Sequence, residues 1–341
     1  PDAELTIGGT DYALTVATVT NSAAGDNKES IASIKRNAPL VFASQQRLVT
    51  ADDYTAIIGQ RFNELIDDVI AWGGEDNVPP IYGRTYVSIN FYDNIPDAVK
   101  TATKNTIAST ISENLAVMSI DTVFTDPAYT YLELRVSFDF DPELTNTTLD
   151  TTQNDIKTAI ASYFSTNLGK FNRTFRQSGL ITTIDALSPA ILNSSMTVKA
   201  QRRFNPTLST IGNYTVDFPM AIAAPDDQNY ILTSSPFTYE GQNCILRNRL
   251  SSTSIEIHDI VNDVILADNV GSYNQTTGVI TLTGFGAGLS AYSGSAIKIS
   301  VTPANQQTIK PLRNYILELD AALTTAAGTI DNQNTTTSLS V

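Results

Sequence analysis

The hydrophobic and polar positions alternate most strictly along residues 131–140. Apolar residues hold every second position there (Leu132, Leu134, Val136, Phe138 and Phe140), and Tyr131, Glu133, Arg135, Ser137 and Asp139 lie between them. Successive side chains of a strand point to opposite faces of a sheet. The run therefore predicts a strand whose sheet has one buried side.

Helical patterns flank this strand. Thr50 and Asp53 form an N-cap signal for a helix with Tyr54 on its apolar face. Further helices are predicted from Pro96 along Val99, Ile107, Ile111, Leu115 and Met118, from Ile156 to Leu168 with Gly169 just after it, and briefly around 180–184. Strands are predicted at 65–72, 87–91 and 196–200. Together they predict an α+β domain over residues 37–204, with helices packed on a mainly antiparallel sheet.

The helical periodicity stops near residue 205. Short strand patterns at 255–258, 264–266, 278–282 and 297–301 then alternate with turns. They predict a separate all-β domain, sandwich-like or barrel-like, over residues 205–305. Residues 1–36 are expected to form a short β and loop segment, and the absence of an initiating Met suggests that it continues from a missing N-terminal part.

The C-terminal segment, residues 306–341, has two interpretations. Its apolar residues are spaced by three and four positions, as in a short coiled coil (Ile309, Leu312, Ile316, Leu319 and Leu323). The stretch 316–320 also alternates like an edge strand. The spacing favours the helix, and in either form the stripe is a possible interface for association.

Charge limits the classes of partner. The net charge is −14, from 35 acidic and 21 basic residues, and the densest basic patch holds only Lys170, Arg173 and Arg176. The negative electrostatic field of a chain with this net charge repels nucleic acid and anionic lipid. We therefore expect neither nucleic acid nor membrane as a partner. Only 16% of the residues are charged, against roughly 25% in typical domains. A surface rich in neutral polar residues loses its water at low cost, which favours protein partners.

No constellation of catalytic residues is apparent. His258 falls on the polar face of a predicted strand and is expected to be exposed, while Cys244 is expected to be buried and inert. Asp139, Asp141 and Glu143 fit a strand ending in a polar turn better than a Ca²⁺ site. The glycines of 284–288 fit a hairpin loop. We therefore expect no enzymatic activity, no cofactor and no metal, although a glycosidase carboxylate pair cannot be identified from sequence alone.

Several short motifs occur in an ordered set. They are Lys35–Pro39, Gln46–Tyr54, Ala71–Gly74, Pro79–Pro80, Tyr82–Ile89, Asn167–Phe171 and Ser178–Ile181. In this order they resemble the phage baseplate J-like family over roughly residues 35–200, and the longer wedge proteins of T-even-type baseplates in particular. The motif residues that we expect to be structural are Asn37, Ala38, Pro39, Thr50, Asp53, Tyr54, Trp72, Gly73, Gly74 and Gly83.

The resemblance implies a structural subunit of a contractile phage tail baseplate wedge. Such a subunit dimerises, joins its neighbours and other wedge proteins into a ring around the tail hub, and changes arrangement when the sheath contracts. It is assembled in the host cytoplasm and resides in the virion.

The main alternative is a carbohydrate-binding or cell-wall-degrading tail protein, which needs an exposed aromatic platform and a carboxylate pair in a groove. A secreted adhesin-like module would need a signal peptide or a stalk, and neither is visible.

Overall fold

The computed structural model describes residues 47–77, 79–112 and 120–331, the strands β1 (Ala3–Ile7) and β2 (Thr10–Leu14), and isolated positions between 31 and 42. The chain divides into two compact units. One comprises Pro1–Asp67 with Phe91–Ser119, and the other comprises Asp68–Asn90 with Ile120–Val341.

The described residues of the first unit include a β-hairpin and the helices α2 and α3. Strands β1 and β2 pair antiparallel, and the helices are α2 (Ala51–Arg61) and α3 (Asp97–Ile107), the latter continued by the π-helical turn η2 (Ala108–Ser112). Thr50 Oγ1 accepts the N–H of Asp53 at 3.3 Å, and the Asp53 carboxylate accepts the N–H of Thr50 at 2.8 Å. This capping box confirms the predicted helix start. The predicted continuation of α3 through Leu115 and Met118 lies outside the described residues.

A three-stranded sheet has the order β3–β4–β5, with β3 at Ile66–Gly73, β4 at Arg84–Phe91 and β5 at Asp121–Thr125. Strands β4 and β5 are parallel. The 3-10 turn η1 (Gly74–Asp76) follows β3, and the N–H of Ile81 donates to the carbonyl of Gly74 at 2.8 Å. A side chain at Gly74 would collide with the carbonyl of Ile81. The close approach of the two backbones therefore requires glycine.

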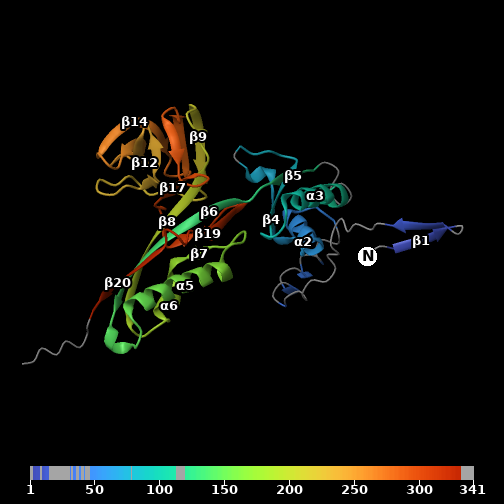
Figure 1. The fold of residues 1–341 in the computed structure, drawn as a ribbon, viewed down its shortest axis with the longest axis horizontal. Helices are drawn as coiled ribbons and strands as arrows, with labels where there is room; N and C mark the ends of the chain where they lie inside the picture. The colour runs from blue at the N-terminus through green and yellow to red at the C-terminus, as the bar shows by residue number, and fades with distance from the viewer. Residues whose placement is uncertain are drawn as a thin grey trace, which may run out of the picture. The chain divides into compact units, whose positions relative to one another are not determined.

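A long antiparallel pair forms the centre of the second unit. Strands β6 (Ala128–Phe140) and β8 (Ile191–Phe204) pair along most of their lengths. Helices α5 (Leu149–Asn167) and α6 (Gln177–Asp185) lie along one side of this pair (Figure 1). The apolar residues of β6 share one core with Ile156, Ile160 and Phe164 of α5. The structure thus confirms the alternating strand and the third predicted helix.

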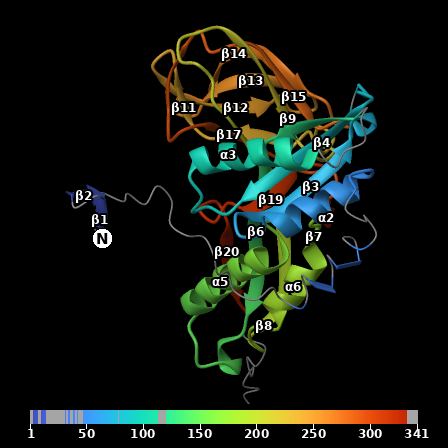
Figure 2. The same cartoon turned by 90° about the vertical axis from the view of Figure 1, so that its right-hand side faces the viewer.

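The region after residue 204 is rich in short strands. These are β9 (Gly212–Asp217), β10 (Leu232–Ser234), β11 (Phe237–Tyr239), β12 (Gln242–Asn248), β13 (Ser254–Asp259), β14 (Val264–Tyr273), β15 (Val279–Phe285), β16 (Leu289–Tyr292) and β17 (Ile297–Val301). Figure 2 shows them gathered at one end of β8, with α5 and α6 near the other.

The two β-regions share the strand β8, and the division into domains at residue 205 stays a prediction. Residues Ala200–Phe204 of β8 pair with β17, and the ladder continues through β10, β12, β13, β14 and β15 to β9. Because β8 is 14 residues long, one end pairs with β6 and the other extends into the β-rich region. The fold therefore combines helices with mixed sheets, and it is mostly β in its C-terminal half.

The C-terminal segment forms strands, so the predicted helix is wrong. Strand β18 (Thr308–Ile309) pairs with β7 (Phe175–Arg176). Strands β19 (Tyr315–Leu319) and β20 (Thr325–Ile330) both pair in parallel with β6. The three-and-four spacing arises here by coincidence, because the five residues belong to separate short strands and to the turns between them. Pairing with β6, almost 200 residues earlier in the chain, decided the conformation.

Candidate functional site

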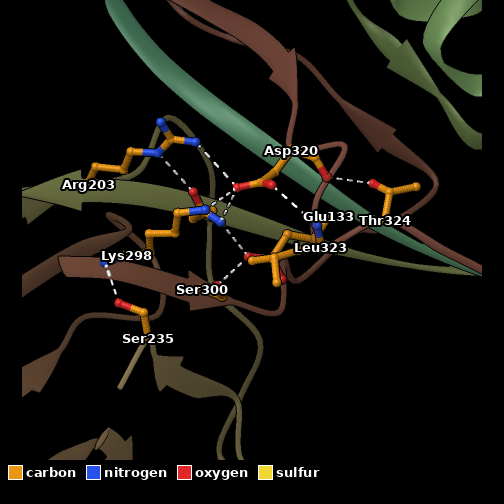
Figure 3. A network of polar contacts seen from close by, with 9 residues as sticks. Glu133, Arg203, Ser235, Lys298, Ser300, Asp320, Leu323 and Thr324 are labelled. Carbon is orange, nitrogen blue, oxygen red and sulfur yellow. Dashed lines mark hydrogen bonds and ion pairs between the residues drawn. The ribbon is translucent and has the colours of Figure 1, made fainter. Parts of the chain in front are cut away.

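A network of polar side chains lies where the C-terminal strands meet β6, β8 and β17. Its carboxylates are buried, whereas the side chains of Arg203 and Lys298 are 36% and 31% exposed. We call it the polar junction, and it consists of Glu133, Gln201, Arg203, Lys298, Ser300 and Asp320 (Figure 3). Four segments that are distant in sequence contribute these side chains. The network therefore forms only when the chain has folded.

Asp320 is the anionic centre of the polar junction. It directly follows β19 and is 5% exposed. Its Oδ2 accepts hydrogen bonds from Lys298 Nζ at 2.8 Å, from Gln201 Nε2 at 3.0 Å and from an Arg203 guanidinium nitrogen at 3.3 Å. Burial alone would raise the pKa of Asp320, but the hydrogen bonds from Lys298 and Gln201 outweigh it and lower that pKa below its ordinary value.

Glu133 is the second buried carboxylate, although the alternation along β6 predicted a polar-face residue. It is 7% exposed. It accepts hydrogen bonds from Gln201 Nε2 at 2.7 Å and from the Ser300 hydroxyl. Although it is withdrawn from solvent, the carboxylate is satisfied by partners on β8 and β17, the next strands of the same sheet.

The polar junction also fixes the turn between β19 and β20. The Thr324 hydroxyl donates to the carbonyl of Asp320 at 2.8 Å and accepts the N–H of Leu134 at 3.4 Å. The N–H of Asp320 donates to the carbonyl of Leu132 at 3.0 Å. Both carboxylates are thus engaged in holding strands in place. This arrangement is suited to a structural role.

Stability should depend on pH through Asp320. Because its pKa is lower in the folded chain, Asp320 contributes stability above its unfolded pKa of about 3.9, and this contribution is lost as the pH falls through the lower folded pKa. We expect Asp320→Asn to unfold at lower urea concentration than the wild type at pH 7, with the difference shrinking toward pH 2. Urea titrations at several pH values measure this. A difference that stays constant with pH would contradict it.

The structure places the motif residues as follows. Asn37 lies outside the described residues, whereas Ala38 and Pro39 are exposed. Thr50 and Asp53 cap α2, Tyr54 is 0% exposed, Gly73 and Gly74 lie at the turn after β3, and Gly83 has a φ of 77°. Their individual roles stay a prediction.

Trp72 is an internal packing residue. Its ring stacks on Tyr86, with ring centroids 5.6 Å apart, and its Nε1 donates to Asn77 Oδ1 at 3.1 Å. It is 8% exposed and belongs to a small core cluster with Ile70, Phe171 and Ile316. It is therefore not an exposed platform for a sugar ring.

The C-terminal stripe is divided between core and surface. Ile309 and Ile316 are buried, Leu319 is half-buried, and Leu312 and Leu323 are exposed. Ile316 and Leu319 are three positions apart in β19 and therefore face opposite ways, and the other three lie in β18 or in turns, so the five residues do not share one face. Only Leu312 and Leu323 remain available to a partner.

His258 is buried, and the expectation that it is exposed was wrong. It is 5% exposed, and its Nε2 lies 3.2 Å from Asp263 Oδ1. It lies on β13, between β12 and β14, where both faces of the strand are covered. Cys244 is a buried free cysteine as predicted, and burial raises the pKa of its thiol.

The described residues include a small surface hollow. One shallow hollow of about 220 Å³ is lined by Phe164, Ser165, Gly169, Leu317, Glu318 and Leu319. It is smaller than the roughly 300–1,000 Å³ of typical ligand pockets. Within the described ranges, no group of three His, Cys, Asp or Glu side chains could hold a metal ion, and no helix is long and apolar enough to cross a membrane.

Sequence reasoning did not find the polar junction. Gln201, Lys298, Ser300 and Asp320 carry no local motif, and Glu133 follows a pattern that normally places a residue in solvent. The one signal in the sequence is the scarcity of charged residues, which makes each charged residue within a predicted strand a candidate for a specific polar contact.

The described part of the chain is thus a protein of helices and mixed sheets in which buried carboxylates join distant strands. Residues 50–123 match the family model of the baseplate structural protein gp6, C-terminal domain I, and residues 128–203 match that of its C-terminal domain III. These two segments are therefore similar to domains of a baseplate structural protein, which confirms the resemblance to phage baseplate proteins over this part of the chain. No curated protein matches the chain at a significant level.

Proposed function

We propose that this protein is a structural subunit of a phage baseplate wedge in the virion tail. It associates with copies of itself and with other baseplate proteins into a ring that rearranges when the sheath contracts. The observation that carries this proposal is the pair of gp6 domain matches, in the same order along the chain as their domain numbers. Its action consists of binding, and it needs no cofactor.

The surface composition supports a role in assembly. Large apolar side chains are exposed at several places in the second unit, among them Tyr82 (79%), Ile211 (70%), Val261 (72%) and Leu312 (57%). Each of these side chains offers apolar area whose burial against a partner is favourable. With only 16% charged residues, little desolvation of charge opposes such contacts.

The absolute mass of the chain in solution tests the self-association. We expect light scattering to show a dimer or larger closed oligomer that forms with rising concentration and persists at high salt, because an apolar interface is weakly screened. Sedimentation velocity on the same samples distinguishes a closed ring from open chains. A monomer at every concentration and salt would remove self-association by this chain from the proposal.

A further inference from the structure

Strand β20 forms an edge of the sheet beside β6. It pairs with β6 in parallel from Thr325 to Ile330, one residue opposite one, without a shift of register. None of its residues has a positive φ, and no strand among the described residues pairs with its other side. Strand β20 is therefore a regular edge, and the backbone groups of such an edge form a template for another strand.

The direction of the ladder identifies the backbone groups on the outer side of β20. The N–H of Asp331 donates to the carbonyl of Phe140 at 2.9 Å, so the backbone groups of Asp331 point toward β6. Successive residues of a paired strand direct these groups to opposite sides, so every second residue before Asp331 also points toward β6. The N–H and carbonyl groups of Ala326, Gly328 and Ile330 therefore point outward.

The neighbouring edge strand, β19, is closed by the chain itself. The N–H of Gly169 donates to the carbonyl of Leu317 at 3.1 Å, on the side of β19 that points away from β6. Within the described ranges, the outward groups of Ala326, Gly328 and Ile330 have no such contact. This margin of the sheet is thus closed at β19 and open at β20.

The edge of β20 has none of the features that prevent two strands from pairing. Natural sheet edges are protected by charged side chains, prolines or bulges. The sequence from Ala321 to Ile330 contains no charged residue and no proline. The side chains of Thr325, Ala327 and Thr329 are exposed and small, so they do not obstruct a neighbouring strand.

A second copy of the same strand fits this edge. Two strands related by a two-fold axis are antiparallel, and both copies use the same surface. With the axis at Gly328, Ala326 of one copy lies opposite Ile330 of the other, and all the outward N–H and carbonyl groups of these residues are paired. Ile330 is 57% exposed and gains an apolar neighbour across the two strands.

Charge also favours this place for a contact between copies. The net charge of −14 opposes association wherever acidic surfaces meet. At the β20 edge the two charge-free stretches face each other, and charges beyond roughly 8 Å are screened at physiological salt. The two copies can therefore approach here without bringing like charges together.

We propose that β20 pairs with β20 of a second copy, antiparallel about a two-fold axis at Gly328, so that the two sheets become continuous. In this register Ala327 of each copy lies opposite Thr329 of the other. The proposal rests on the proposed function, because it assigns the self-association of the chain to this edge.

Sedimentation velocity and residue-resolved hydrogen exchange on the full chain test the pairing. We expect a dimer that forms with rising concentration. In the dimer, the amides of Ala326, Gly328 and Ile330 should exchange at least tenfold more slowly, because they become donors to the second copy. The amides of Ala327 and Thr329 point toward β6 and should change much less.

Charge variants at Ala327 and Thr329 test the register. A chain with Ala327→Lys and Thr329→Lys, and a chain with Ala327→Glu and Thr329→Glu, should each raise the dimer dissociation constant at least tenfold, because like charges oppose each other. An equimolar mixture of the two chains should form a heterodimer, since each Lys then lies opposite a Glu. This recovery on mixing also shows that both variants are folded.

A chain with Ala327→Lys and Thr329→Glu is the matched control. It changes the same two positions but places opposite charges across the two strands, so it should dimerise at least as tightly as the wild type. Weaker dimerisation of this control would overturn the register at Gly328.

Three other results would overturn the proposal. A dimer that persists in the doubly Lys and doubly Glu chains would assign self-association to another surface and leave the proposed function standing. A full chain that is monomeric at every concentration would remove both the pairing and the self-association, but not the similarity to baseplate proteins. If only a chain ending at Asp331 dimerised, the edge would belong to residues 332–341 of its own chain.

Discussion

Deleting residues 311–341 is expected to abolish cooperative folding of the second unit. The deletion removes β19 and β20, which cover the edge of β6, and it removes the buried Ile316 and Leu317 together with Asp320 of the polar junction. Each large buried aliphatic residue contributes about 2–5 kcal/mol, and a domain has only about 5–15 kcal/mol in total. Thermal unfolding followed by circular dichroism should therefore lose its transition, and light scattering should show aggregation.

Leu312→Ala is the control for this deletion. Leu312 lies in the same segment but is 57% exposed, so its loss should change stability by less than about 0.5 kcal/mol. A truncated chain that stays monodisperse and melts cooperatively would contradict the prediction. It would show that the second unit does not need this segment for its stability, and that the segment serves association with other molecules instead.

Replacing Trp72 by alanine is expected to destabilise the second unit by about 3–5 kcal/mol. The change removes a stack on Tyr86, a hydrogen bond to Asn77 and contacts within the cluster that contains Ile316. Trp72→Phe should cost less, because it keeps an aromatic ring and loses the hydrogen bond. Trp72 is the only tryptophan, so its replacement removes the tryptophan fluorescence signal. Urea unfolding is therefore followed by far-ultraviolet circular dichroism.

Tyr82→Ala provides the comparison for Trp72. Tyr82 is 79% exposed, so its removal should leave stability nearly unchanged. If Trp72→Ala were as stable as the wild type but lost binding to a glycan or to a baseplate protein, the residue would be a binding residue and the packing role would be wrong.

Local elements of the fold could be predicted from the sequence because their determinants are close together in the chain. The capping box needs only Thr50 and Asp53, and the strand β6 is evident from the alternation over residues 131–140. The end of α5 follows from Gly169, whose φ of 77° suits glycine. In each case a short-range steric or hydrogen-bond rule decides the conformation.

The candidate site could not be predicted, because its members come from strands far apart in sequence. Nothing near Glu133 indicates that β17 covers it, and nothing near Lys298 indicates a carboxylate 22 residues later. His258 shows the same difficulty, since alternation indicates which residues share a face of a strand and not whether that face meets water.

The sequence alone thus determined the helices and strands with local signals, the family resemblance carried by ordered motifs, and the acidic, lightly charged surface that favours protein partners. The tertiary structure decided that residues 315–330 are parallel strands on β6, that β8 joins the two β-regions, and that Glu133 and Asp320 are buried together. The physical reason is that strand pairing is non-local. A strand acquires its hydrogen-bond partners, and therefore its burial and charge environment, from residues that its own pattern does not specify.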